Sequence, residues 1–167
     1  MAFDENFFHG EDVHPIDIVE HIAATQDWEF DRMEDDQIAM AVEGKWRTYA
    51  LCLAWSSMDE TLRLIATFDM DPPAHRMDAL HETLNAVNDN CWVGSYTYWE
   101  EQGVMVYRYG LLLTGGQYAT PAQIDSMISA AVASTERFYP AFQLATWGEQ
   151  PTSEAMQVAI AEAYGRA

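Results

Sequence analysis

The sequence predicts an α+β fold: an antiparallel sheet of about six strands, in a group of four and a later hairpin, with helices packed mainly on one face. Two observations predict it. Apolar residues alternate with other residues in six separate segments, which is the period of half-buried strands. In three longer segments they recur at three- and four-residue spacing, which is typical of helices that lay one stripe on a sheet.

The first half of the chain reads as one helix followed by four strands. An apolar stripe with Pro15 in its first turn predicts a helix over about residues 14–26. Four alternating segments follow, and turn residues separate them. Their apolar positions lie within residues 28–32, 38–42, 49–55 and 62–68.

The second half begins with a helix that crosses over between the two groups of strands. Its apolar stripe spans residues 77–87 and ends at an Asn-Asp-Asn sequence. Residues 92–99 and 104–113 then form a hairpin rich in aromatic and β-branched residues. Thr120 and Pro121 begin a long helix that Pro140 is expected to kink or restart, and a short stripe over residues 156–164 follows.

Composition limits the possible partners and the cellular compartment. The 167 residues suit a single domain, and 27 acidic against 8 basic side chains give a formal net charge of −19. Such a charge repels phosphate backbones and anionic lipid, so we expect no nucleic acid and no membrane as partner. No basic residue precedes Arg32, and Cys52 and Cys91 are too few for a disulfide framework, so we expect a cytoplasmic protein.

Side chains that could bind a metal have a simpler explanation. His14, Asp17 and His21 would share one sector of the first helix, and imidazole plus carboxylate can ligate zinc. That sector is also the polar face opposite the apolar stripe, and a fourth rigid ligand is missing. We therefore predict no metal site, no cofactor and no catalytic residues.

Arg108 is the most informative single residue, because it lies in the middle of an otherwise apolar strand. It is expected to be paired with a carboxylate, exposed, or in contact with a partner, and pairing is the most common arrangement. If helices cover one face of the sheet, some of the many aromatic residues lie on the other face, and protein interfaces concentrate Trp, Tyr and Arg. The candidate binding residues are Arg108, Trp55, Trp99, Tyr98 and Asn85.

Three local sequences carry a family resemblance: LNAVND at Leu84–Asp89, VYRYGLLL at Val106–Leu113 and YPAF at Tyr139–Phe142. In this order and spacing they resemble the YbjN-domain family of bacterial proteins, over roughly residues 15–147. The resemblance implies a fold similar to type III secretion chaperones, which form dimers that hold partner polypeptides. It also implies a role as a sensory transduction regulator. The expected organisation is a flexible acidic arm (1–13), this domain (14–147) and a tail with a short helix (148–167).

The sequence thus favours a non-enzymatic, chaperone-like or regulatory module that is a homodimer and binds a polypeptide through its sheet or a helix groove. The acidity of the chain favours a basic partner. One alternative is an enzyme or small-ligand protein with a pocket between the second helix and the sheet, in which Arg108 meets an anion and Asn85 or a histidine assists. Another is that the N-terminal arm, with Phe3, Phe7 and Phe8, is a docking peptide.

Overall fold

The computed structural model describes residues 13–164, so the predicted N-terminal arm lies almost entirely outside the described residues. The helices are α1 (Pro15–Thr25), α2 (Met77–Asp89), α3 (Pro121–Thr146) and α4 (Thr152–Tyr164), with a short 3-10 helix η2 (Ala74–Arg76) before α2. The strands are β1 (Glu29–Glu34), β2 (Gln37–Glu43), β3 (Thr48–Ser56), β4 (Thr61–Asp69), β5 (Ser95–Trp99) and β6 (Val104–Leu112).

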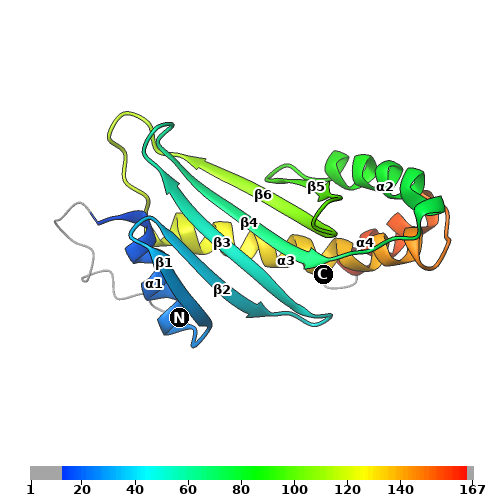
Figure 1. Cartoon of the computed structure of the whole chain (residues 1–167), viewed down its shortest axis with the longest axis horizontal. Coiled ribbons are helices and arrows are strands. Elements are labelled where there is room, and N and C mark those ends of the chain that lie inside the picture. The colour runs from blue at the N-terminus through cyan, green and yellow to red at the C-terminus, as the bar shows by residue number, and fades with distance from the viewer. Residues whose placement is uncertain (1–12, 165–167) are drawn as a thin grey trace.

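The six strands form one antiparallel sheet in the order β1-β2-β3-β4-β6-β5 (Figure 1). The first four strands follow chain order, and each pairs with the next in a continuous antiparallel meander. The later hairpin then adds β6, rather than β5, beside β4. The predicted α+β class, with four strands and a later hairpin in one antiparallel sheet, is confirmed.

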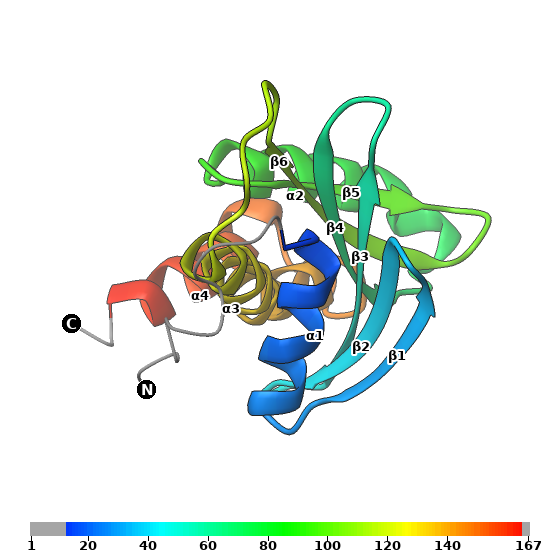
Figure 2. The same cartoon turned by 90° about the vertical axis from the view of Figure 1, so that its left-hand side faces the viewer.

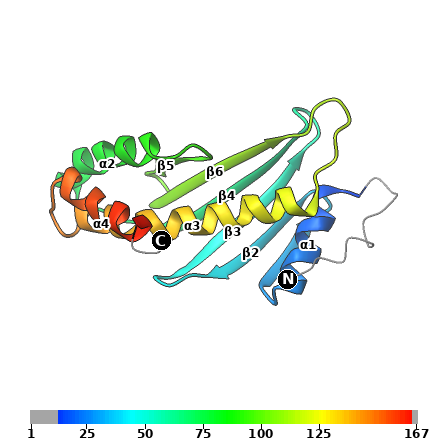
Figure 3. The same ribbon diagram turned by 180° about the vertical axis from the view of Figure 1, so that it is seen from behind.

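The helices lie on one face of this sheet. On β3, Tyr49, Leu51 and Leu53 are fully buried, whereas Ala50 and Cys52 between them are not. Because side chains alternate along a strand, the larger apolar ones point to the helices and the smaller ones point away. Figure 2 shows α1, α3 and α4 on the same side of the curved sheet, and Figure 3 shows α3 running across it. In residues 13–164 no helix covers the other side, which we call the open face.

Buried aromatic side chains pack together on the covered face. Tyr96 and Tyr107 pack edge to face with their ring centroids 5.2 Å apart, and both are buried in the main core. Burial raises the pKa of Tyr107 to about 12 and that of Tyr96 well above the ordinary tyrosine value, because the charged form would lose its water. The core is therefore concentrated between the sheet and the helices.

Helix α3 runs without interruption through Pro140, where a kink or restart was expected. Thr120 caps its start, since the hydroxyl accepts a hydrogen bond from the Gln123 N–H and the Gln123 side chain accepts one from the Thr120 N–H. Proline costs about 3 kcal/mol inside a helix. Phe138 and Phe142, on either side of it, are buried against the sheet, and we infer that this packing outweighs the cost.

The later hairpin begins at Ser95, three residues after the predicted start at Trp92. Trp92 belongs to the loop after α2 and is 99% exposed. Gly94 has a φ of +74°, and a side chain there would collide with the Tyr107 ring. The close approach of this loop to Tyr107 therefore delays the strand.

Helix α4 packs against α3 and α2. Ala155, Met156 and Ala159 are buried, and the hydroxyls of Thr83 and Thr152 lie 3.1 Å apart in a buried hydrogen bond. The region after residue 148 thus contributes to the same core as the preceding elements.

Candidate functional site: the open face of the sheet

The five candidate binding residues fall into three places. Arg108 and Trp99 lie on the open face, because they alternate with buried or core-packed residues on β6 and β5. Trp55 and Tyr98 occupy the alternate positions of their strands, so their side chains lie on the covered face and pack against the core. Asn85 is exposed on α2. The structure therefore brings together only Arg108 and Trp99, and these two share a face rather than a pocket.

Trp55 and Tyr98 have structural contacts on the helix side of the sheet. The Tyr98 hydroxyl donates a hydrogen bond to the Met70 carbonyl at 2.9 Å. The Trp55 ring meets the His14 ring edge to face, with centroids 6.5 Å apart, at the start of α1. Both side chains help to hold elements onto the covered face.

The arrangement does not support an anion pocket formed by Arg108 and Asn85 between α2 and the sheet. Helix α2 packs with α3 and α4 and touches the sheet at β5. It turns Leu80 and Val87 into the main core. The Arg108 side chain lies on the face of the sheet opposite to the helices.

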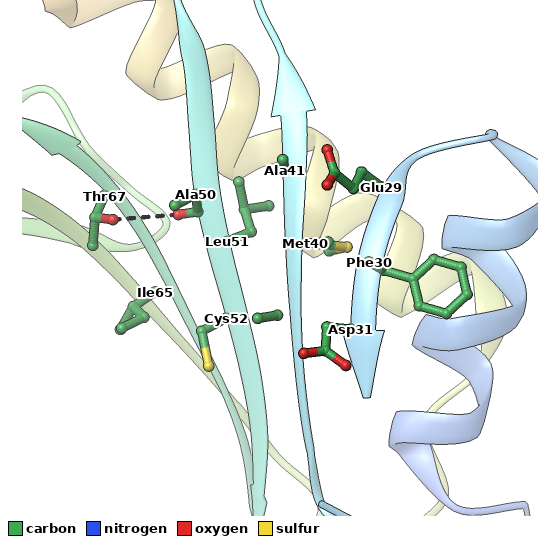
Figure 4. Close-up of a pocket in the computed structure, with 11 residues that line it drawn as sticks. Glu29, Phe30, Asp31, Met40, Ala41, Ala50, Leu51, Cys52, Ile65 and Thr67 are labelled. Atoms are coloured by element: carbon green, nitrogen blue, oxygen red, sulfur yellow. Dashed lines mark hydrogen bonds between the residues drawn. The ribbon is translucent and has the colours of Figure 1, made fainter. Parts of the chain in front are cut away.

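The middle of the open face is built from small side chains, as Figure 4 shows. Strands β2 and β3 supply them side by side, and we call the set the small-residue floor: Ala39, Ala41, Ala50 and Cys52. Glu29 and Asp31 of β1 flank it on one side, and Ile65 and Thr67 of β4 flank it on the other. The result is a shallow hollow of about 370 Å³.

Register aligns part of this face into a row that runs directly across five strands. Each member is the direct cross-strand partner of the next, so the row is fixed by the backbone ladder. We call it the central row: Asp31, Ala39, Cys52, Ile65 and Arg108. It runs from an exposed carboxylate on β1 to an exposed guanidinium on β6, beyond which Arg108 pairs with Ser95 of the edge strand β5. Cys52 lies midway between Asp31 and Arg108.

Arg108 stands apart from the other basic side chains. Within residues 13–164 it has no hydrogen bond, ion pair or ring contact, and it is exposed. Every other basic side chain in that range has a partner: Arg32 (Asp17 and Glu20), Lys45 (Trp46), Arg47 (Asp69), Arg63 (Asp59), Arg76 (Ala145) and Arg137 (Ala159). The pairing with a carboxylate that sequence reasoning favoured for Arg108 is therefore not what the structure shows.

Arg63, the other cation on the open face, is already engaged. Its guanidinium pairs with Asp59 in the turn between β3 and β4. Hydrogen bonds from Ser56 and from Arg63 hold the pKa of the Asp59 carboxyl below its usual value. Arg108 is thus the cation of this face that is available to a partner.

The two edge strands of the sheet are protected against pairing with another strand. On β5, the Tyr96 N–H donates to Asn88 Oδ1 at 2.7 Å, and Asn88 Nδ2 donates to the Tyr96 carbonyl at 3.0 Å. The Asn88 amide thereby takes the place that a neighbouring strand would occupy. On β1, Arg32 Nε donates to the Glu34 carbonyl at 2.9 Å, next to an irregularity in the ladder. Blocked and charged edges disfavour strand addition and leave the open face as the accessible part of the sheet.

Neither a cluster of metal ligands nor a membrane-spanning helix occurs in the described part of the chain. No three His, Cys, Asp or Glu side chains there are grouped so that they could hold a metal ion. None of the helices in residues 13–164 has the length and apolarity that crossing a bilayer requires.

Comparison with known proteins identifies the family. Residues 15–144 match the model of the YbjN family, described as "Putative bacterial sensory transduction regulator". The chain belongs to the YbjN family. No curated protein sequence matches it at a significant level.

The YbjN fold is also evident in a solved structure. The crystal structure of YbjN from E. coli, titled "a putative transcription regulator", superposes with a TM-score of 0.52 and 12% sequence identity. The match covers 91% of this chain and 94% of that one. At this identity the likeness establishes the fold.

The three local sequences that resemble YbjN proteins have different roles here. LNAVND contains Asn88, which protects the β5 edge, and YPAF contains Phe142, which is fully buried in the core. VYRYGLLL alternates between the core-facing Tyr107 and the exposed Arg108. Two of them are therefore structural, and the third places Arg108 on the open face of the YbjN sheet.

Sequence reasoning missed Asp31 and the small-residue floor. The signal was present as alternation: Ala39 and Ala41 fall between Ile38, Met40 and Val42. Residues between core positions occupy the second face of a strand, and a run of small ones there leaves a flat surface. The alignment of Asp31 with Arg108 depends on register over five strands, which one strand's pattern does not contain.

Proposed function

We propose that this YbjN chain is a non-enzymatic, chaperone-like or regulatory module that acts by binding another polypeptide through the open face of its sheet. The observation that carries the proposal is the one-sided covering of the sheet. An antiparallel sheet whose free face faces only water usually has polar residues there. Here the centre of that face is the small-residue floor, and Arg108, two strands away on β6, has no ion pair within residues 13–164.

The shape of the face favours a protein over a small molecule. Pockets for small ligands enclose most of their ligand and hold a few precisely placed polar groups. The hollow on the open face is shallow, and its flanking carboxylates, Glu29 and Asp31, are exposed to water. A broad sheet face with small side chains at its centre, and with Arg108 and Trp99 elsewhere on the same face, is typical of a surface that another protein covers.

A regulatory role follows from the family description, and a chaperone-like role follows from the resemblance to type III secretion chaperones. Both act through contacts with other polypeptides, and both need a surface that folding of the chain leaves uncovered. The protected edges of β1 and β5 support the open face, rather than an edge strand, as that surface.

Replacing Ala50 by arginine tests the proposal. The side chain at position 50 points out of the floor and is exposed, so we expect unfolding free energy to change by no more than about 0.5 kcal/mol. A bulky charge on the floor prevents close approach, so binding of a polypeptide partner is expected to weaken about tenfold or more. Capture by the tagged chain from its native cell extract, with quantitative mass spectrometry, measures this.

The matched control is Ala24→Arg. Ala24 is an exposed alanine on α1, away from the open face, so the same chemical change there leaves binding intact. Partners retained by the wild type and by Ala24→Arg but lost from Ala50→Arg support the proposal. Equal retention by all three chains contradicts it.

A further inference from the structure

The central row is self-complementary. Asp31 on β1 and Arg108 on β6 lie at its two ends, with Cys52 of β3 midway between them. A two-fold axis parallel to β3, in the plane between two stacked sheets and passing over Cys52, exchanges the two ends of the row. It places Arg108 of each copy over Asp31 of the other, which gives two identical contacts, as a two-fold interface requires.

We propose that the open face docks against the open face of a second copy of this chain, with Arg108 paired with Asp31 in both directions. The inference rests on the proposed function, because it names the polypeptide that covers the face. It goes further by fixing the register, the rotation axis and the residues that meet.

Charge favours a second copy over a basic partner. Although the chain as a whole is strongly acidic, Arg108 is, within residues 13–164, the cation of the open face that has no ion pair, and it would repel a basic surface. It is complementary to an acidic surface, and this chain presents one at the correct distance along its own row. Asp31 is exposed and has no ion pair within residues 13–164.

The small-residue floor fits face-to-face packing. Stacked sheets lie about 10 Å apart, and their side chains interdigitate. The rotation sets Ala50 and Cys52 of β3 against the same residues of the other copy. It sets Ala39 and Ala41 of β2 against Ile65 and Thr67 of the other copy's β4. Small side chains at the centre let the sheets approach closely enough for the long Arg108 side chain to reach Asp31 of the other copy at the margins.

Two exposed apolar residues are covered by the same rotation. Leu112 at the end of β6 is 70% exposed, and Met33 in the irregular part of β1 is 57% exposed. Both lie beyond the central row toward the same end of the sheet, on the outer strands that the axis exchanges. Each Leu112 is thereby placed near the Met33 of the other copy, where burial of both stabilises the dimer.

The area of the face is close to what a dimer needs. Five strands of six to nine residues, at about 4.8 Å spacing and about 3.3 Å per residue, give roughly 630 Å² per copy. A standard-size interface buries about 800 Å² per partner. Two copies of charge −19 repel each other at long range, so association is best measured at physiological ionic strength, where the screening length is about 8 Å.

Charge exchange provides the test. Sedimentation equilibrium of the purified full chain is expected to show a dimer. Arg108→Asp and Asp31→Arg each place like charges at both contacts, and each is expected to raise the dimer dissociation constant about 100-fold. When the two variants are mixed, both contacts again join opposite charges, so a heterodimer is expected to form from two chains that are monomeric alone.

Lys45→Asp is the matched control. It makes the same change in net charge as Arg108→Asp, in the turn between β2 and β3, away from the central row. It is expected to leave the dimer intact, and thermal unfolding verifies that every variant is folded.

Three outcomes overturn the inference: a monomeric wild type, a dimer unaffected by either substitution, or failure of the mixed variants to associate. A monomeric chain that still loses a captured protein on Ala50→Arg refutes this inference and leaves the proposed function standing. In that case a different polypeptide, such as a basic one, occupies the face. If the chain is monomeric and Ala50→Arg changes nothing, both fail.

Discussion

Phe142→Ala is expected to lower the free energy of unfolding by about 3–5 kcal/mol, the usual cost of removing a buried phenylalanine. Phe142 is fully buried on α3, with its ring centroid 5.6 Å from that of Tyr96 and 6.4 Å from that of Phe68. Truncation leaves a cavity where α3 packs on the sheet, and the rigid surroundings cannot close it. Urea unfolding measures the change.

Trp92→Ala is the control for this prediction. Trp92 is a larger aromatic residue but is 99% exposed, so its loss is expected to change stability by no more than about 0.5 kcal/mol. Similar losses for both variants would show that α3 is not the principal cover of the sheet, which would remove the distinction between a covered and an open face.

Glu136→Ala is expected to cost about 2–4 kcal/mol, because three groups lose their acceptor at once. The Glu136 carboxylate accepts hydrogen bonds from the Tyr49 hydroxyl at 2.6 Å, the Lys45 N–H at 2.9 Å and the Trp46 N–H at 3.3 Å. Tyr49 is fully buried, and burial together with this hydrogen bond raises its pKa. The carboxylate thereby ties α3 to the hairpin of β2 and β3, the strands that carry the small-residue floor.

Two further substitutions provide references for this loss of unfolding free energy, which urea unfolding measures. Glu136→Gln keeps an acceptor and is expected to lose less than half as much, whereas Glu154→Ala removes an exposed carboxylate on α4 and is expected to be neutral. If Glu136→Ala were as mild as Glu154→Ala, the contact between α3 and the hairpin would not be what positions the floor.

Alternation was enough to predict the sheet, because each strand has one face in the core. The pattern at Ile38, Met40 and Val42 and the one at Leu51 and Leu53 identify the buried face without any structure. The same alternation assigns Trp55 and Tyr98 to the covered face and Trp99 and Arg108 to the open face. Choosing candidate residues by type had combined residues from both faces. The alternation of positions along each strand was therefore a more reliable guide to the site than residue type.

The errors arose where tertiary packing outweighed a local rule. Pro140 is accommodated because residues on both sides of it are buried, and Trp92 lies outside its predicted strand because Gly94 approaches Tyr107. Arg108 has no carboxylate partner in residues 13–164, since its cross-strand neighbours on the open face are Ile65 and Ser95. Those neighbours are set by register, and no single strand encodes register.

The rate of Cys52 alkylation tests the central claim, that a polypeptide covers the open face, most directly. Cys52 lies at the midpoint of the central row, while Cys91 lies in the loop after α2, where burial raises its pKa, and serves as an internal reference. In native cell extract, the Cys52 rate relative to Cys91 is predicted to be several-fold lower in the wild type than in Ala50→Arg. The same ratio in both chains would contradict the account.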